Sequence, residues 1–587
     1  MTITDELSQI VGAAFAAEGL EPATGVVRFS DRPEFGQFQS NGALAAAKAN
    51  KANPREIAEA IATRLKTDAR LKDVSVAGPG FINLSLSDDE LSRRAEALAQ
   101  DAAAGGWRNP RPQRMVIDYG GPNVAKPLHV GHLRSAIIGE SLKRLMRAAG
   151  DHVISDIHLG DWGLPMGQLI TELARERPDL PYFDPAFEGP YPLVAPTTLD
   201  DLERLYPQAA NASKTEEAHA AAAREATAGL QKGRAGYVAL WRHFVAVSRA
   251  GIERDYADLG VSFDWWKGES DADPLIAGMA ADMRAQGVVE SSEGAEIIRV
   301  GREGDKKEIP PLILFKSDGS VLYGTTDLAT ILDRKRAAHP DRILYVVDGR
   351  QRDHFEQVFR AADRAGLFPQ ARLEHLWFGT MNGADGKPFK TRAGGVVKLR
   401  DMIDTVRERA RERLKESGLG EGYGEAEAAD IAHKVGVAAL KFADLSNPRT
   451  SDYVFDLDRF MAFEGKTGPY LLYASVRVKS VLAKAEDKAA GAPGPIVVCE
   501  PEERSLALAL LAFGDAMKVA YEKRMPHFLA DHVFVLAQAF SKFYAACRIA
   551  DESEAATRAS RLALAKATGK QLDFALDLLG IAVPGRM

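Results

Sequence analysis

The sequence predicts a multidomain protein with an α+β N-terminal domain, a doubly wound, Rossmann-like α/β domain with insertions, and an all-α bundle toward the C-terminal end. Three observations predict this arrangement. The chain has 587 residues, which suits about four domains at roughly 150 residues each. A strand, a Gly/Pro-rich loop, a helix and a second strand follow one another from Met115. From about Ala428 onward the apolar spacing is almost wholly helical.

Composition and charge are those of an ordinary globular protein. The residues are 46% apolar and 27% charged, which excludes collagen-like, coiled-coil and wholly disordered chains. Two cysteines exclude a disulfide framework and a Cys-rich zinc site. The 75 basic and 82 acidic residues give a net charge of −7, which disfavours a general nucleic-acid coat but allows a nucleic-acid enzyme with a local basic face.

The sequence also indicates where the protein works. The acidic start, Met-Thr-Ile-Thr-Asp-Glu, argues against a signal peptide. The longest apolar run, 506–514, is too short to span a membrane. We therefore expect a soluble, cytoplasmic protein with no membrane partner.

Residues 1–108 are expected to form the N-terminal domain. Pro54 opens an amphipathic helix whose apolar face carries Ile57, Ile61 and Leu65. Two short apolar segments, 74–76 and 81–84, flank a Gly-Pro-Gly turn and predict a β-hairpin. The Gly/Pro/Arg-rich segment at 105–112 has the composition of a linker.

Residues 109–427 are expected to form the doubly wound domain. An apolar strand at 115–117, a Gly/Pro-rich loop and a helix that ends at Gly150 lead into a strand at 153–157. This βαβ pattern implies a parallel sheet. An insertion at about 171–310, with an Ala- and Glu-rich helical segment at 200–231, separates the two halves. The second half is expected to contain strands at 312–315, 343–347 and 373–378 and a helix at 353–365.

Residues 428–587 are expected to form the helical bundle. Apolar stripes at 506–517 and 532–547 predict two of its helices, and a loop rich in Ala, Gly and Pro at 489–495 separates two others. Before the bundle, the segment 407–416 intersperses Arg with Glu, which is typical of a solvent-exposed helix with paired charges.

The first candidate site is His129-Val130-Gly131-His132, where a loop after a strand passes into a helix. Chance gives a His-x-Gly-His motif roughly 0.02 times in a chain of this composition. A helix N-terminus after a parallel strand binds anions through free N–H groups and its positive dipole end. Gly131 lets a ligand approach the backbone, and both imidazoles are expected to donate to phosphate oxygens. The alternatives are a metal pair at i, i+3 and two structural histidines.

The second candidate site is a basic loop at 387–392, Lys-Pro-Phe-Lys-Thr-Arg, followed by Gly394 and Gly395. No acidic residue occurs between Lys387 and Arg400. The loop follows the last predicted strand of the sheet, and ligands of doubly wound sheets bind at the carboxyl ends of the strands. We therefore expect the loop to meet the histidines; the alternative is an exposed basic loop without a ligand.

These motifs resemble those of arginyl-tRNA synthetase, a class I aminoacyl-tRNA synthetase. Residues 121–135, GPNVAKPLHVGHLRS, are similar to the family signature, and residues 158–163, HLGDWG, to the segment that follows it. The basic loop stands in the place of the class I KMSK loop. Further similarities lie at 38–41, 78–83, 468–474, 543–544 and 547–548, so the resemblance covers essentially the whole chain.

Two departures separate the chain from the class I motifs. Pro388 and Phe389 replace the Met-Ser of KMSK, while Lys390 matches its second lysine, so the motif does not define the role of Lys387. Val130 stands where class I enzymes often have isoleucine, a change with little consequence.

The resemblance implies an enzyme that activates arginine with ATP and Mg²⁺ and transfers it to tRNA(Arg), with no tightly bound protein metal. It implies a monomer whose N-terminal domain contacts the tRNA elbow and whose bundle binds the anticodon. The implied site residues are His129, His132, Lys126 and Lys390 for catalysis; Asp118, Asn123, Tyr323, Asp327 and Gln351 for arginine; and Gly131, Lys387 and His158 for ATP. Carboxylates suit this substrate because they match a planar guanidinium bidentately.

Several alternatives stay open at this point. Asp327 also suits a helix N-cap, and Tyr470, Tyr473 and Tyr544 suit either RNA stacking or a helical core. One rival function is a small-molecule nucleotidylyltransferase, which shares a His-x-Gly-His site but needs no all-helical C-terminal domain. A second rival is a catalytically inactive tRNA-binding paralogue; the presence of both histidines and Lys390 argues against it.

Overall fold

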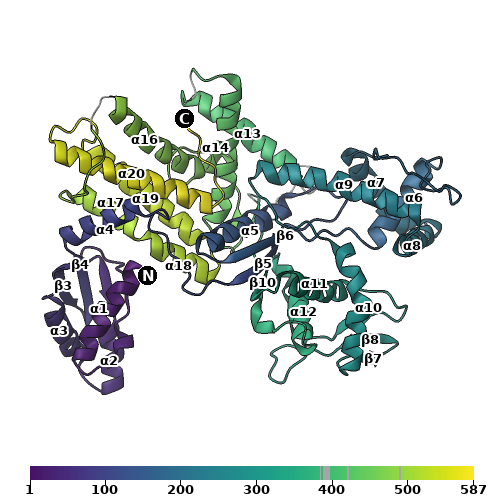
Figure 1. Cartoon of the computed structure of the whole chain (residues 1–587), viewed down its shortest axis with the longest axis horizontal. Coiled ribbons are helices and arrows are strands. Elements are labelled where there is room, and N and C mark those ends of the chain that lie inside the picture. The colour runs from purple at the N-terminus through teal and green to yellow at the C-terminus, as the bar shows by residue number, and fades with distance from the viewer. Residues whose placement is uncertain (384, 388–396, 420–421, 488–490) are drawn as a thin grey trace.

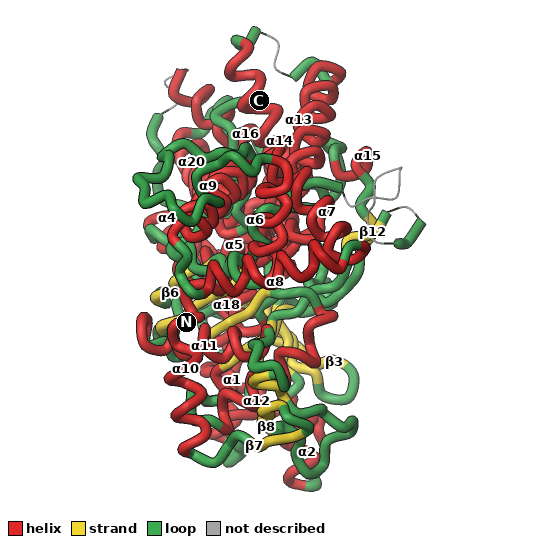
Figure 2. Tube along the Cα trace, turned by 90° about the vertical axis from the view of Figure 1, so that its right-hand side faces the viewer, coloured by secondary structure: helices red, strands yellow, loops and turns green. Residues whose placement is uncertain are grey.

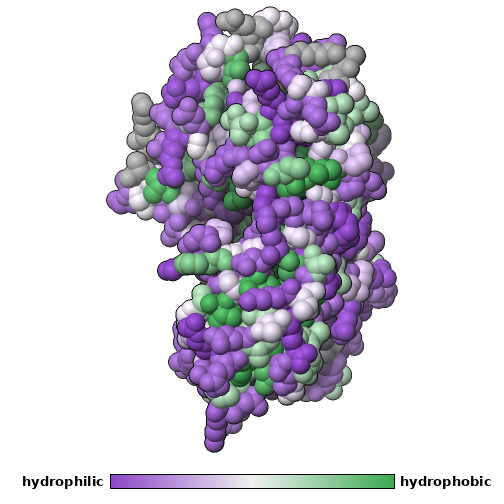
Figure 3. Space-filling view, turned by 90° about the vertical axis from the view of Figure 1, so that its left-hand side faces the viewer, coloured by the Kyte–Doolittle hydropathy of each residue, from purple (hydrophilic) through white to green (hydrophobic). Residues whose placement is uncertain are grey.

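The structure is a computed structural model that describes all 587 residues except 384, 388–396, 420–421 and 488–490. Figure 1 shows the N-terminal domain beside a helical bundle, a parallel sheet near the centre, and a helical insertion that extends away from both. Seen from the side, helices fill one end of the molecule and most strands lie toward the other (Figure 2). The face that bears the N-terminal domain and the bundle is largely hydrophilic, with small apolar groups (Figure 3). Among the described residues, no helix combines the length and hydropathy needed to cross a membrane.

The N-terminal domain packs helices against a four-stranded antiparallel sheet of order β1-β2-β4-β3. The predicted hairpin and the predicted helix from Pro54 are both confirmed. Gly80 closes the hairpin turn with φ +142°, and a Cβ there would lie 2.8 Å from the carbonyl oxygen of Pro54, so only glycine fits. The elements are α1 (Ile3–Ala17), β1 (Val27–Phe29), β2 (Phe38–Ser40), α2 (Gly42–Asn50), α3 (Pro54–Leu65), β3 (Leu71–Ala77), β4 (Phe81–Leu86) and α4 (Asp88–Gln100), with a 3₁₀ turn at Pro22–Thr24.

The central domain contains a parallel sheet of order β11-β10-β5-β6. Its strands are β5 (Arg114–Tyr119), β6 (His152–Asp156), β10 (Arg342–Val346) and β11 (Leu373–His375). The crossover helices are α5 (Val130–Ala148), between β5 and β6, and α12 (Arg352–Arg364), between β10 and β11, while α11 (Tyr323–Ala338) precedes β10.

Alternate residues of β5 enter different cores, as a sheet covered on both faces requires. Met115, Ile117 and Tyr119 pack with α5 and the bundle. Val116 packs with the core that contains α11 and α12. The doubly wound prediction is therefore confirmed.

One predicted strand lies in a different sheet. Residues 312–315 form β9 (Leu312–Phe315), as expected, but β9 pairs antiparallel with β8 (Ala295–Ile298), which pairs with β7 (Glu290–Ser292). Its assignment to the second half of the parallel sheet was wrong. Leu312 and Leu314 are buried while Ile313 is 39% exposed, and this alternation is typical of a sheet with one wet face.

The segment from α6 to α10 is mainly helical, and the expected bounds of the insertion, about 171–310, stay a prediction. Its helices are α6 (Leu164–Glu176), α7 (Leu199–Thr215), α8 (Glu217–Gln231), α9 (Ala235–Asp258) and α10 (Glu269–Ala285). The predicted helical segment at 200–231 is two helices that meet at Glu216. The buried His219 connects three of them, because its ring nitrogens lie 3.1 Å from Glu172 of α6 and 2.9 Å from Ser213 of α7.

The C-terminal part is a helical bundle, as predicted. Its elements are α13 (Leu399–Glu416), α14 (Glu425–Leu445), α15 (Leu457–Phe460), α16 (Gly468–Asp487), α17 (Pro501–Leu511), α18 (Phe513–Lys523), α19 (His527–Ala546) and α20 (Ala555–Leu578). The apolar stripe at 506–517 is not one helix, because the chain breaks between α17 and α18 at Ala512. A short parallel pair, β12 (Met381–Asn382) with β13 (Tyr453–Val454), connects the bundle to the central domain. The domain boundaries at 108/109 and 427/428 stay predictions.

Candidate active site

A cleft of about 310 Å³ lies at the carboxyl ends of the parallel strands. The chain leaves β5 toward one edge of the sheet and β10 toward the other, so the cleft lies at the switch point of the topology, where ligands of such sheets bind. The lining residues are Asp118, Gly120, Gly121, His129, Gly131, His132, Ser135, His158, Asp327, Tyr345, Val347, Asp348, Arg350, Gln351, Phe355 and Phe378.

The two histidines of the motif cap the helix that they begin. His129 is the N-cap of α5, and its Nδ1 accepts a hydrogen bond from the Gly131 amide at 3.0 Å. His132, three residues on, accepts at Nδ1 from the His129 amide at 3.1 Å. A ring nitrogen that accepts from an amide carries no proton, so a neutral ring keeps its proton on Nε2. Each imidazole therefore presents an Nε2–H donor while its other edge holds the backbone.

The histidines are neutral at physiological pH. Burial and, second, the electrostatic interaction with His129 lower the pKa of His132 to about 3. Burial, then the charges of Lys126 and Arg350, lowers the pKa of His129 as well. The pair can thus donate hydrogen bonds to an anion without carrying charge, and the positive charge near them comes from Lys126 and Arg350.

The expectation of free backbone N–H groups at this helix end was wrong. The amide of Val130 donates to Val397 O at 3.0 Å, that of Gly131 to the His129 ring, and that of His132 to His129 O at 2.8 Å. The reason given for glycine at 131 also changes, because a Cβ there would lie 2.7 Å from His129 Cε1. Gly131 makes room for the capping ring.

The start of α5 is joined to the segment that follows the basic loop. Leu399 donates its amide to Leu128 O at 2.8 Å, next to the bond from Val130 to Val397. Lys390 lies outside the described residues; Lys387 is described, and it does not line the cleft. The residues after the loop thus lie beside the histidines, which agrees with the expected meeting of the two candidate sites.

Ser135 connects the sheet to α5. Its hydroxyl accepts from the Gly120 amide at 2.8 Å and donates to Val346 O at 2.6 Å, so it holds the ends of β5 and β10 together. Gly120 has φ +72°, and a Cβ there would lie 2.9 Å from the Tyr256 hydroxyl. The sequence analysis missed Ser135, although it is the last residue of the quoted signature.

Asp118 is already paired with a guanidinium of the chain. Arg334, fully buried on α11, lies 2.5 Å from Asp118 and 2.7 Å from Asp156. Burial raises the pKa of Asp118, although the Arg334 charge opposes it. The sequence analysis missed Arg334. Its only sequence signal is its position seven residues after Asp327, which places both on one face of a helix.

Asp327 also lines the cleft, and it too has a partner that the sequence analysis missed. Its carboxylate lies 2.6 Å from His354 Nε2, and this hydrogen bond raises the pKa of His354. The N-cap alternative for Asp327 was wrong, because the N-cap of α11 is Leu322. Glu269, at the start of α10, is also nearby: burial, then the charges of Asp161 and Asp327, raises its pKa to about 7. Nothing in the sequence distinguishes Glu269 from the other acids.

Seven of the twelve expected site residues line one cleft: Asp118, His129, Gly131, His132, His158, Asp327 and Gln351. Three others lie outside this lining. Tyr323 is 70% exposed at the first turn of α11. Asn123 is exposed in a backbone bridge with Gly160. Lys126 places its ammonium 4.7 Å from the ring centroid of Tyr206.

The remaining points concern His158 and the alternative that the paired histidines bind a metal ion. His158 Nδ1 is buried, and within the described residues it has no hydrogen-bond partner. In the same part of the chain, no group of three or more His, Cys, Asp or Glu side chains is placed to hold a metal ion.

A second cavity, of about 420 Å³, lies in the helical bundle. Arg477 lies over the rings of Tyr473 at 4.6 Å and Tyr544 at 5.7 Å. Tyr470 and Tyr473 are half-buried, and Tyr544 is 43% exposed. These tyrosines are thus surface residues near a pocket, which fits stacking better than the alternative of a helical core.

Three family descriptions match successive parts of the chain. "Arginyl tRNA synthetase N terminal domain" matches residues 1–86, "tRNA synthetases class I (R), catalytic domain" residues 94–457, and "DALR anticodon binding domain" residues 471–587. The chain is similar to the arginine–tRNA ligases of Hyphomonas neptunium, at 56% identity, and Maricaulis maris, at 55%, over 100% of both chains in each pair.

Solved structures have the same fold. The arginyl-tRNA synthetase of Plasmodium falciparum aligns with a TM-score of 0.82 at 24% identity, and that of Thermus thermophilus with 0.80 at 22%. Each alignment covers 100% of both chains.

The neutral form of His132 is directly measurable. We expect ¹⁵N NMR of labelled protein to show an unprotonated Nδ1 and a protonated Nε2 that persist from about pH 8 to about pH 5, below the ordinary histidine pKa of about 6.5. His354 is the control, because its raised pKa should keep it charged to higher pH. Protonation of His132 near pH 6.5 would contradict the capping geometry.

Proposed function

The chain belongs to the class I arginyl-tRNA synthetases, and we propose here how its residues carry out the arginine–tRNA ligase reaction. The enzyme joins arginine to ATP with release of pyrophosphate and then esterifies the 3′ end of tRNA(Arg). The structural observation that supports this proposal is the neutral His129–His132 pair in the cleft. The chain that carries it is 56% identical to an arginine–tRNA ligase over its full length.

In the first step, the carboxylate of arginine attacks the α-phosphorus of ATP and pyrophosphate leaves. The protein supplies no covalent nucleophile, so its work is to position the reactants and stabilise charge on the triphosphate. The Nε2–H groups of His129 and His132 donate to phosphate oxygens. Because both rings are held by backbone amides and carry no charge to be neutralised, they need little rearrangement as charge develops.

The phosphates also need positive charge. Lys126 and Arg350 are close enough to contribute, after burial, to the lowered pKa of His129, and this proximity supports a role for their charge toward a bound triphosphate. Lys387 and Lys390 of the basic loop are assigned the same task, and His158 and Gly131 complete the expected ATP site. Mg²⁺ would be held by the ATP phosphates themselves, as suits an ion that keeps most of its waters. It would balance the charge of the leaving pyrophosphate.

The arginine side chain is recognised by the acidic end of the cleft. Among the described contacts, neither Asp327 nor Glu269 pairs with a guanidinium, so both carboxylates can receive that of the substrate. Asp118, in contrast, already pairs with Arg334. A substrate guanidinium would compensate the repulsion that raises the pKa of Glu269. Gln351 lines the cleft and suits the amino or carboxylate group of arginine, and Asn123 and Tyr323 are assigned to the same substrate.

The tRNA contacts both ends of the chain. The N-terminal domain would bind the tRNA elbow. The bundle cavity lined by Tyr473 and Arg477, together with Tyr544 beside Arg477 (the Tyr473–Arg477–Tyr544 pocket), would stack an unpaired anticodon base. We also propose that the enzyme acts as a cytoplasmic monomer.

The function is tested by arginine-dependent exchange of labelled pyrophosphate into ATP, together with charging of tRNA(Arg) by labelled arginine. We expect charging, and exchange that is negligible without tRNA and rapid with it. Pyrophosphate exchange that depends on neither arginine nor tRNA would instead support a small-molecule nucleotidylyltransferase. Tight tRNA binding with neither activity would support an inactive paralogue.

His132→Ala should reduce adenylate formation by about 10²–10³, the cost of removing one preorganised donor from a developing charge. The fold should persist, which thermal melting would show. His152→Ala is the control, because His152 is exposed on β6 away from the cleft. Near wild-type exchange by His132→Ala would remove the histidine from the mechanism.

Asp327→Asn should raise the Michaelis constant for arginine by at least about thirtyfold, the lower end of the cost of truncating one member of a buried charge pair, and should change that for ATP far less. It should also narrow the preference for arginine over citrulline, which lacks the charge. Asp333→Asn is the control, because Asp333 lies on the same helix and pairs with Lys267 instead. Equal effects on arginine and ATP would indicate a structural role.

A further inference from the structure

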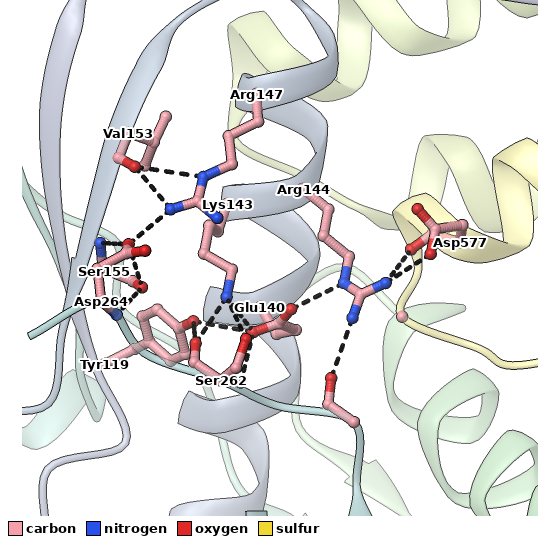
Figure 4. Close-up of polar contacts among 12 residues, drawn as sticks. Tyr119, Glu140, Lys143, Arg144, Arg147, Val153, Ser155, Ser262, Asp264 and Asp577 are labelled. Atoms are coloured by element: carbon pink, nitrogen blue, oxygen red, sulfur yellow. Dashed lines mark hydrogen bonds and ion pairs between the residues drawn. The ribbon is translucent and has the colours of Figure 1, made fainter. Parts of the chain in front are cut away.

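Side chains of α5 and α14 cap the C-terminal end of α20, and Figure 4 shows the contact of Arg144 with Asp577. The hydroxyl of Ser141 on α5 donates to Leu578 O at 2.9 Å, and Arg144, also on α5, donates to Asp577 O at 3.3 Å. Lys441 of α14 donates to Gly580 O at 2.5 Å. The last carbonyls of a helix lack partners within it, so these donors satisfy groups that the helix leaves open.

Arg144 also contacts a buried carboxylate of its own helix, that of Glu140. Glu140 is 1% exposed and lies 2.7 Å from both Lys143 and Arg144. It also accepts from the Tyr119 hydroxyl at 3.0 Å and the Ser262 amide at 3.2 Å. Burial would raise the pKa of Glu140, but Lys143 and Arg144 keep it below its usual value. Glu140 is therefore a charged group fixed by four donors.

The Glu140 carboxylate is connected to the cleft by the backbone of β5 and by packing between α5 and β5. Tyr119 ends β5 and directly follows Asp118, which lines the cleft. A Cβ on Gly139 would lie 2.2 Å from the Tyr119 ring, so α5 and β5 are in van der Waals contact at this level. The same helix carries His129 and His132 at its start. A displacement of α5 at Glu140 would thus reach the histidines through a single rigid helix.

One turn earlier in the chain, α20 is bonded to the helix that lines the bundle pocket. Asp573 accepts from the Ser475 hydroxyl at 2.6 Å and pairs with Lys479 at 3.1 Å, both on α16. Between those two residues of α16 lies Arg477, which lines the pocket. Asp573 and Asp577 are four residues apart and share one face of α20. Asp577 pairs with Arg144 at 2.6 Å (Figure 4).

We propose that Asp577 is a positioning residue for α5, and that α20 couples the Tyr473–Arg477–Tyr544 pocket to the paired histidines through Arg144 and Glu140. The inference rests on the proposed function, in which the pocket takes an anticodon base and the histidines take the triphosphate. RNA in the pocket would favour one placement of α16. Asp573 and Asp577 would carry that preference along α20 to α5, because each joins α20 to a neighbouring helix.

The charge of Asp577 can be removed with little effect on the fold. Its side chain is 64% exposed, and exposed ion pairs contribute little to stability. The backbone carbonyl that Arg144 also binds is kept in any side-chain variant. The matched control is Glu427→Gln, because Glu427 forms a comparable exposed pair with Arg586 within the bundle, away from α5.

The test measures tRNA affinity by fluorescence titration and pyrophosphate exchange at saturating arginine, ATP and tRNA(Arg). Asp577→Asn should lower the exchange rate at least about fivefold, the lower end of typical coupling between sites. Its dissociation constant for tRNA should stay within about twofold of wild type, as for an exposed substitution. Asp577→Glu, which keeps the charge, should recover most of the rate, and Glu427→Gln should match wild type.

A double-mutant cycle separates coupling from simple destabilisation. Arg477→Ala removes the pocket cation, and on its own it should lower both tRNA affinity and the saturated exchange rate. Changes at separate sites usually combine multiplicatively. If α20 connects them, the double variant Arg477→Ala/Asp577→Asn should exchange no more slowly than Arg477→Ala alone.

An unchanged rate for Asp577→Asn, a loss confined to tRNA affinity, or multiplicative effects in the cycle would each overturn the proposal. None of those results would affect the assignment as an arginine–tRNA ligase. Absence of exchange and charging in the wild-type enzyme would contradict the proposed function itself, and with it this inference.

Discussion

Helix α5 is buried on nearly every side, and its polar side chains must therefore find partners inside the protein. Fourteen of its nineteen residues are buried, among them Arg134, Glu140 and Lys143. A buried charge without a partner is very costly, so each requires a counter-charge or hydrogen bonds from a neighbouring element. Arg134 pairs with Asp444 of α14 at 2.8 Å and also donates to Ser451 O. The placement of the bundle on the central sheet follows from these requirements, and so does the placement of the histidines.

A second consequence of burial is that the acidic cleft is largely balanced before any substrate arrives. Arg334 lies between Asp118 and Asp156, and His354 lies against Asp327. Burial, and then the charges of Asp161 and Asp327, raise the pKa of the nearby Glu269 to about 7. A cationic substrate therefore enters a site with limited excess negative charge, and recognition depends on the geometry of a few carboxylates more than on a strong field.

Much of this was predictable from sequence because it depends on local patterns. The βαβ unit, the histidine motif and the bundle each come from contiguous residues whose spacing has one structural meaning. What failed depended on distant partners. The four apolar residues of β9 suit either a parallel or an antiparallel sheet, and only their pairing with β8 decides. Arg334 and His354 are ordinary charged residues until the fold brings them to Asp118 and Asp327. The occupied amide of Val130 at the start of α5 likewise depends on Val397, which is far away in the chain.

The mutual capping of His129 and His132 explains why this site uses histidine twice. Serine, aspartate or asparagine would cap the helix equally well, but their short side chains would have no second group left to reach a ligand. Lysine or arginine would reach the ligand but has no acceptor for an amide. Imidazole alone has an acceptor and a donor on opposite edges of one rigid ring, so each histidine holds the backbone on one side and keeps a donor for a ligand on the other. Selection for the start of the helix and selection for ligand binding therefore act on the same side chains, and neither position can be optimised for one task without loss of the other.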